Sequence, residues 1–140
     1  MCMEIKPKLA VTGYRGIWGE TLTEEIVKKY TKAFAQFVKE NVSKDNPTIL
    51  IGRDGRENGL NIKRIVIEEL KSINIDIIDG DILPTPTVLL AVKNHNYDGA
   101  IIITASHNPR EYNGLKFVTN KALLTNEAQV EIIKKYYDHS

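Results

Sequence analysis

The sequence predicts an α/β fold, a three-layer α/β/α domain with a mixed, mostly parallel four-stranded sheet. Short apolar runs alternate along the chain with longer segments of helical periodicity, as in βαβ units. The connections between these segments are short, which favours parallel crossovers between the strands. The chain has 140 residues, 42% of them apolar, which is enough for the core of one domain.

A glycine-rich segment, Gly13-Tyr14-Arg15-Gly16, comes first and predicts a tight loop that brings backbone close to a ligand. The first helix is expected from Thr23 to about Glu40, because Thr23 suits an N-cap and apolar residues then recur at helical spacing. Asp45-Asn46-Pro47 marks the turn that follows. Residues 48–51 are apolar and β-branched, which predicts a strand buried on both faces.

The middle of the chain predicts one crossover unit. A second helix is expected over about residues 58–72, and residues 73–78 alternate like a strand. With the strand at 48–51, they make a strand, helix, strand unit whose two strands run parallel. Pro84-Thr85-Pro86 predicts a turn and then the start of a helix, because proline is tolerated in a first helical turn. Tyr97-Asp98-Gly99 ends that helix.

The last third of the chain predicts two more strands and a helix. Residues 100–103 form another buried-strand candidate, and residues 115–118 form a fourth, short one. A final helix is expected over residues 126–137. The sequence has no internal repeat or interdomain linker, so residues 1–140 are expected to form one domain.

Composition narrows the possible partners and compartment. Nineteen basic and eighteen acidic residues give a net charge of +1 without long runs of one sign, so neither nucleic acid nor a membrane is an expected partner. Cys2 is the only cysteine, which excludes an intramolecular disulfide and fits a cytoplasmic protein. The apolar runs are far shorter than the roughly 20 residues that span a bilayer.

The most informative segment is Thr104-Ala105-Ser106-His107-Asn108-Pro109, directly after the strand at 100–103. Ligand sites in open α/β sheets lie beyond the carboxyl ends of strands. Asn108-Pro109 favours a turn that would hold Ser106 at the apex of the loop. A serine placed in this way can carry an acyl or a phosphoryl group. From the residues alone, a catalytic loop and a polar structural loop both remain open.

Phosphoryl transfer suits this loop better than hydrolysis. His107 is adjacent to Ser106, and neighbouring side chains on extended backbone point apart, so His107 is unsuited to deprotonate it as in a hydrolase triad. The glycine-serine-glycine elbow of α/β-hydrolases is also absent. Phosphoryl transfer depends mainly on positioning and on charge neutralisation by cations. The cationic side chains available for it are His107, Lys116, Arg15 and Arg53.

The loop and the segment after it, Tyr112-Asn113-Gly114-Leu115-Lys116, closely resemble the phosphoserine loop of phosphoglucomutases, phosphomannomutases and phosphoglucosamine mutases. The resemblance extends to the glycine-rich segment at residues 13–16, to Gly52-Arg53-Asp54-Gly55-Arg56 and to Leu83-Pro84-Thr85-Pro86, in the family's order and spacing. The chain thus resembles domain I, the N-terminal domain of the α-D-phosphohexomutase superfamily, with domains II–IV absent from it.

The resemblance implies a phosphoserine mechanism. Ser106 would carry the phosphoryl group, give it to a hexose monophosphate and recover the other phosphoryl group from the resulting bisphosphate, which interconverts hexose 1-phosphate and hexose 6-phosphate. A phosphate oxygen on Ser106 would bind Mg²⁺. The residues that match catalytic positions are Ser106, His107, Lys116 and Arg15, and those that match substrate-binding positions are Thr12, Tyr14 and Asn108.

Several of these residues also have structural interpretations. Arg15 could pair with a local carboxylate such as Asp54, and Arg53 and Arg56 are expected to be mainly structural. Asp79-Gly80-Asp81 resembles the first three residues of the family's metal loop, but the aspartate and arginine that complete that loop are missing here, so no Mg²⁺ site is predicted there.

The resemblance also implies that the chain depends on partners. The metal aspartates and the sugar-selecting and distal phosphate loops belong to the other three domains of the family, in cis or in trans. We therefore expect the isolated chain to bind Mg²⁺ weakly and to show little or no mutase activity on a hexose phosphate substrate. The alternative is a non-catalytic binding or regulatory module that retains the fold.

Overall fold

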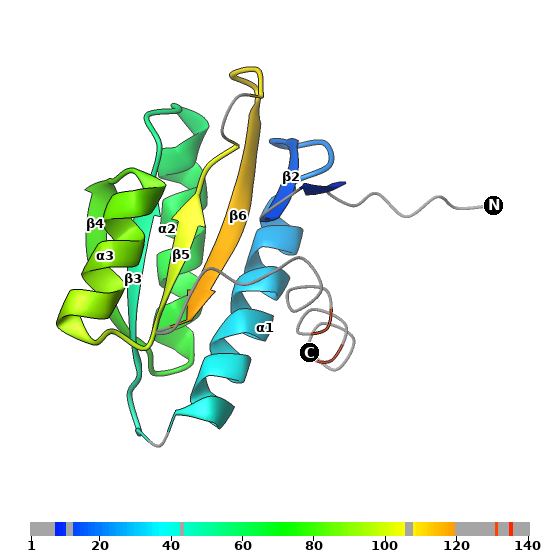
Figure 1. The fold of residues 1–140 in the computed structure, drawn as a ribbon. Helices are drawn as coiled ribbons and strands as arrows, with labels where there is room; N and C mark the ends of the chain where they lie inside the picture. The colour runs from blue at the N-terminus through cyan, green and yellow to red at the C-terminus, as the bar shows by residue number, and fades with distance from the viewer. Residues whose placement is uncertain are drawn as a thin grey trace.

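The computed structural model describes residues 8–10, 13–42, 44–105, 108–119, 131 and 135. These residues form a central sheet with helices on both faces (Figure 1), so the predicted three-layer α/β/α class is confirmed. In chain order the elements are β1 (Lys8–Ala10), β2 (Gly13–Ile17), α1 (Glu24–Asn41), β3 (Thr48–Arg53), α2 (Asn58–Ser72), β4 (Asp76–Ile82), α3 (Thr85–His95), β5 (Gly99–Ile103) and β6 (Tyr112–Thr119).

The sheet is mixed, as predicted, but it has six strands instead of four. Its strand order is β1-β2-β6-β5-β3-β4. β3 pairs in parallel with both β4 and β5, which confirms the crossover through α2. β6 is antiparallel to β5, and the hairpin of β1 and β2 continues the antiparallel half of the sheet. Parallel pairing is therefore confined to β5, β3 and β4, and three of the five strand pairs are antiparallel, so the expectation of a mostly parallel sheet was wrong.

The expected tight loop at residues 13–16 is instead strand β2, and this prediction was wrong. Its backbone pairs with the free side of β6, from Tyr14 opposite Leu115 to Ile17 opposite Tyr112. Gly16 is needed for a close approach, but to the chain itself: an added Cβ would lie 2.6 Å from Thr21 Oγ1. That hydroxyl accepts a hydrogen bond from Ile17 N at 2.8 Å. The absence of a side chain at Gly16 therefore lets β2 pack closely against the turn that contains Thr21.

Strand β4 begins three residues later than predicted. Ile73 caps α2 through its backbone N–H, and Asn74 adopts φ +61°, so the chain is still turning where alternation had predicted a strand. β4 continues to Ile82 and thus includes Asp79-Gly80-Asp81. The pairing with β3 shifts between Ile51 and Gly52, which accommodates one additional residue in β4.

The helices follow the predicted periodicity closely. Thr23 caps α1, and its Oγ1 accepts a hydrogen bond from Ile26 N at 3.3 Å. α2 has the predicted bounds, and α3 ends at Asn96 in the left-handed conformation, which asparagine tolerates well. The helix expected at 126–137 lies outside the described residues, apart from residues 131 and 135, which are helical.

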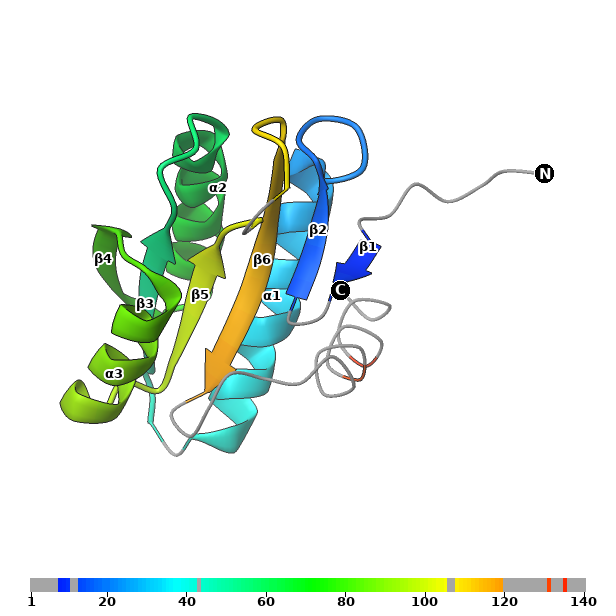
Figure 2. The ribbon, with the colours of Figure 1, turned by 45° about the horizontal axis from the view of Figure 1, so that its top comes forward.

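Two apolar clusters hold the three layers together. Figure 2 shows the layers, with α1 and α2 on one face of the sheet and α3 on the other. The larger lies between the sheet and the pair of helices α1 and α2, where the rings of Phe34 and Phe117 stack with centroids 4.7 Å apart. The smaller lies on the opposite face, where Val88 and Val92 of α3 pack on β3, β5 and β6. Within the described ranges, no helix is both long and apolar enough to cross a bilayer.

Candidate phosphoryl-transfer site

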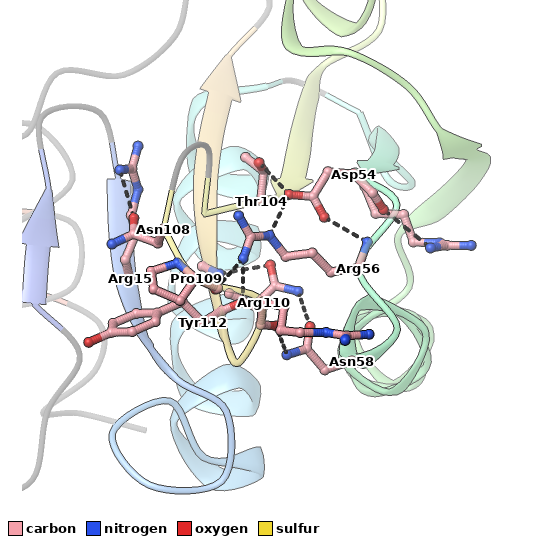
Figure 3. A network of polar contacts seen from close by, with 12 residues as sticks. Arg15, Asp54, Arg56, Asn58, Thr104, Asn108, Pro109, Arg110 and Tyr112 are labelled. Carbon is pink, nitrogen blue, oxygen red and sulfur yellow. Dashed lines mark hydrogen bonds and ion pairs between the residues drawn. The ribbon is translucent and has the colours of Figure 1, made fainter.

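The carboxyl ends of β3 and β5 bring two polar loops together at one edge of the sheet (Figure 3). The strands are parallel neighbours, so the residues that follow them must emerge side by side. Asp54 N donates to Ile103 O at 3.0 Å, and the hydroxyl of Thr104 donates to Asp54 Oδ2 at 2.8 Å. The motif after β3 therefore lies against the segment predicted to carry the chemistry.

Two backbone hydrogen bonds shape the loop between β5 and β6. Asn108 N donates to Ala105 O at 3.1 Å, and Tyr112 N donates to Pro109 O at 2.9 Å. The chain therefore turns at Asn108 and Pro109, as the sequence predicts. Ser106 and His107, the two central predictions for the site, lie outside the described residues, and so does Thr12.

Arg15 reaches this loop from β2. Its Nη1 donates to Asn108 Oδ1 at 3.2 Å, and the two side chains lie side by side in Figure 3. The carboxylate of Asp54, considered above as a partner for Arg15, instead accepts hydrogen bonds from Arg56 and Thr104. The fold therefore brings together Arg15 and Asn108, which are separated by 93 positions in the sequence.

Lys116 lies on the same face of the sheet as Arg15. Arg15 pairs with Gly114 across β2 and β6, and residues directly opposite in an antiparallel pair point to one face. Lys116 is two residues from Gly114, so its side chain shares that face.

Lys116 is a buried lysine rather than a solvated one. It is 8% exposed, and no carboxylate of the described residues pairs with its ammonium group. Burial lowers its pKa below the ordinary value of 10.5, and the positive charge of Arg15 lowers it further. Two cations held close together, one of them desolvated, are typical of a site that binds an anion. Tyr14 belongs to β2 beside Leu115, and its backbone alone is described.

The acidic pair of the Asp79-Gly80-Asp81 segment is held by cations from neighbouring elements. Lys63 lies 3.0 Å from Asp79 and 3.1 Å from Asp81, and the buried Arg53 donates to Asp81 Oδ1 at 2.7 Å. The hydrogen bond from Arg53 and then that from Lys63 lower the pKa of Asp81. The hydrogen bond to Asp79 is the largest cause of the raised pKa of Lys63. Arg53 has the structural role expected from the sequence.

Sequence reasoning missed the part that Asp54 and Arg56 play at this edge. Arg56 is structural, as expected, but the sequence did not indicate its partners: its guanidinium joins Asp54 to the backbone of the loop that follows β5. The available signal was the position of both residues directly after β3, because parallel neighbouring strands deliver their following loops to the same edge.

The described residues also bear on the expected metal. Among them, no group of three histidine, cysteine, aspartate or glutamate side chains is arranged to hold a metal ion. The described side chains alone therefore do not make up a magnesium site.

Comparison with known proteins gives one consistent result. Residues 7–140 match the family described as "Phosphoglucomutase/phosphomannomutase, alpha/beta/alpha domain I". A phosphoglucosamine/phosphogalactosamine mutase of Sulfurisphaera tokodaii is 44% identical over 106 residues, which are 76% of this chain and 22% of that protein. A phosphoglucomutase/phosphomannomutase of Thermococcus kodakarensis is 36% identical over 125 residues, 89% of this chain and 27% of that protein. The chain thus spans about a quarter of the length of these relatives.

Solved structures share the fold. A phosphoglucomutase/phosphomannomutase family protein of Burkholderia thailandensis superposes with a TM-score of 0.79 at 26% identity, over 92% of this chain and 29% of that one. A putative phosphomannomutase of Thermus thermophilus gives a TM-score of 0.82 at 22% identity, over 96% of this chain and 30% of that one, and supports the fold alone. Together with the arrangement at the end of β5, these matches show that the chain belongs to the phosphoglucomutase/phosphomannomutase family, as its α/β/α domain I.

Proposed function

We propose that this domain carries a phosphoryl group on Ser106 and exchanges it with a hexose phosphate, within an enzyme that interconverts hexose 1-phosphate and hexose 6-phosphate. The observation that supports the proposal best is the buried ammonium group of Lys116 beside Arg15, which bonds Asn108 two residues after Ser106. A phosphoserine carries a charge of about −2 at neutral pH, and these cations would balance it.

Each transfer exchanges one P–O bond for another. The bond between Ser106 Oγ and phosphorus would break while a sugar hydroxyl oxygen bonds to phosphorus; the sugar hydroxyl would lose its proton and Ser106 Oγ would take one up, so the protons balance. The bisphosphate would then return its other phosphoryl group to Ser106 Oγ, which leaves the sugar phosphorylated at the other position. Fixed positive charge stabilises such transfers, because the phosphoryl oxygens remain negative throughout.

Lys116 could contribute in two ways. Protonated, it would stabilise charge on the phosphoryl oxygens, and because its pKa is lowered, it exchanges a proton more readily near neutral pH than an exposed lysine does. His107, which is adjacent to Ser106 in the sequence, matches a proton-handling position by the family resemblance. Both assignments are part of this proposal.

We further propose that the reaction uses Mg²⁺ and needs the remaining mutase domains, in cis or in trans. A phosphate oxygen on Ser106 would be the ligand that this chain supplies to the Mg²⁺ ion. The isolated 140-residue chain is expected to interconvert glucose 1- and 6-phosphates at little more than background rate. Enzyme-like turnover by the purified chain would contradict the need for further domains.

Intact-mass measurement tests the phosphoserine directly. The purified chain is incubated with glucose 1,6-bisphosphate and Mg²⁺, and we expect it to gain the mass of one phosphoryl group. Ser106→Ala should abolish the gain. Ser72→Ala is the matched control and should leave it intact, because Ser72 ends α2 and its hydroxyl bonds Glu69 O. No gain in the wild-type chain, or an undiminished gain in Ser106→Ala, would overturn the proposal.

A further inference from the structure

The two loops at the carboxyl edge of the sheet are tied together through one ion pair. Arg56 Nε donates to Asp54 Oδ2 at 3.1 Å, and the amide of Arg56 donates to Asp54 Oδ1 at 3.2 Å. The same carboxylate accepts the hydroxyl hydrogen of Thr104. The side chain of Arg56 is 13% exposed and that of Asp54 is 29% exposed, so water screens this pair only in part.

Arg56 extends the connection across to the second half of the β5–β6 loop. Its Nη1 donates to Pro109 O at 2.5 Å and to Tyr112 O at 3.2 Å (Figure 3). One guanidinium thus bonds a carboxylate and two carbonyl groups. Lysine could not reproduce this set, because its ammonium is a point charge without the planar fork of donors.

A hollow of about 660 Å³ lies between the two loops, lined by residues 55–58, 108, 110 and 111. Polar contacts span it: besides Arg56, the side chain of Asn58 accepts a hydrogen bond from Asn113 Nδ2 at 2.6 Å. The relative position of the loops therefore depends strongly on hydrogen bonds with defined directions.

These contacts lie on both sides of Ser106 in the sequence. Thr104, two residues before it, bonds Asp54, and Pro109, three residues after it, bonds Arg56. We propose that the Asp54–Arg56 pair is a positioning pair, which fixes both flanks of the loop and so determines the position of residue 106. The catalytic significance of the pair rests on the function proposed above.

The expected effect on phosphoryl transfer is large because positioning is a major part of such catalysis. A displacement of about 1 Å can reduce a transfer rate by on the order of 10²-fold. Arg56 would act without touching the phosphoryl group, through the carbonyl groups of Pro109 and Tyr112. Its removal should therefore change where the phosphate lies and leave Arg15 and Lys116 themselves intact.

The test places phosphoserine at position 106 by genetic incorporation and follows its ³¹P resonance during a pH titration of the 140-residue chain. In the wild-type background, Arg15 and Lys116 should lower the pKa of the phosphate below its ordinary value of about 6. Arg56→Gln should abolish about half or more of that displacement, and Arg56→Lys should do nearly the same although it keeps the charge. The use of two variants protects the test if one of them fails to fold.

Arg110→Gln is the matched control. Arg110 lies in the same loop, its side chain is 86% exposed, and it lies 4.0 Å from Glu57. Its replacement removes one positive charge, as Arg56→Gln does, but should leave the ³¹P titration within experimental error of the wild type. Equal shifts in Arg110→Gln and Arg56→Gln would overturn the positioning role, because they would show an effect of net charge alone. An unshifted wild-type phosphate would overturn it as well.

The titration separates this proposal from the proposed function. A wild-type chain that gains no phosphate from glucose 1,6-bisphosphate, but whose installed phosphoserine titrates low and responds to Arg56, would refute the transfer function and support the positioning. A chain that gains phosphate at the same rate with or without Arg56, and whose titration is unchanged, would support the function and refute the positioning.

Discussion

Lys116 and Arg15 occupy one face of the sheet, on neighbouring antiparallel strands, and the positive charge of Arg15 contributes to the lowered pKa of Lys116. Two cations in this arrangement repel each other, and burial withholds the water that would stabilise Lys116. The pair therefore costs stability in the domain as it stands, and an anion bound beside it would recover that stability.

Lys116→Met is expected to stabilise the chain while abolishing its phosphorylation. Methionine fills a similar volume without a desolvated charge, so the free energy of unfolding should rise by about 1 kcal/mol. Urea unfolding at pH 7 measures the change. Lys93→Met, at an exposed position of α3, is the control and should remain within about 0.5 kcal/mol of the wild type. A clear loss of stability in Lys116→Met would contradict the account of Lys116 as a strained cation.

The advantage of Lys116→Met should shrink as the pH rises. The pKa of Lys116 in the folded chain is below its ordinary value of 10.5, so between those two values the unfolded chain binds more protons than the folded chain. Stability of the wild type therefore rises with pH across that window, relative to a variant without the amine. Urea unfolding of both proteins from pH 7 to pH 10 measures the difference in their free energy of unfolding. A difference that stays constant with pH would refute the lowered pKa of Lys116.

Asp98→Ala should be strongly destabilising. The carboxylate is 5% exposed, accepts a hydrogen bond from Thr48 N at 2.7 Å and pairs with Lys44 at 3.0 Å. Removal leaves the amide of Thr48 without this acceptor, at a cost of about 2–3 kcal/mol in the free energy of unfolding. Asp98→Asn should cost less, because its amide oxygen can still accept from Thr48 N. Thermal and urea unfolding report both values, and equal losses would contradict the importance of the Thr48 contact.

Gly16→Ala should destabilise the chain by about 1–3 kcal/mol, because its Cβ would overlap the hydroxyl of Thr21 at 2.6 Å. Thr21→Ala removes the overlapping atom, so the double variant should lose less than the sum of the two single variants. Gly55→Ala is the control: a Cβ there meets no atom within 4 Å, and a change within about 0.5 kcal/mol is expected. Strict additivity at 16 and 21 would disprove the overlap.

Sequence periodicity predicted α1 and α2 and the parallel strands β3 and β5, because each helix buries one face and each of these strands is buried on both. α2 has the expected bounds, and β3 and β5 are apolar runs between helical layers. The hairpin strand β2 escaped prediction because two of its five residues are glycine, which carries no apolar pattern. Its strand conformation depends on pairing with β6, a contact between residues about 100 positions apart in the sequence.

The sequence indicated individual residues of the candidate site, but not the hydrogen bonds that connect them. The order of motifs indicated Arg15, Asn108 and Lys116, and the fold brings these three together. The role of Arg56 could not be predicted, because its acceptors are backbone carbonyl groups, which leave no trace in a pattern of side chains. The later start of β4 could not be predicted either, because it depends on the left-handed conformation of Asn74.

The edge strand β4 has a consequence for how the domain behaves at high concentration. Within the described part of the chain its one strand neighbour is β3, so its outer backbone faces outward. Asp79 and Asp81 hold the cations of Lys63 and Arg53 beside this strand, and its pairing with β3 is irregular near Gly52. A second molecule that added a strand there would meet these paired charges and an irregular edge, which disfavours growth into fibrous aggregates at this border.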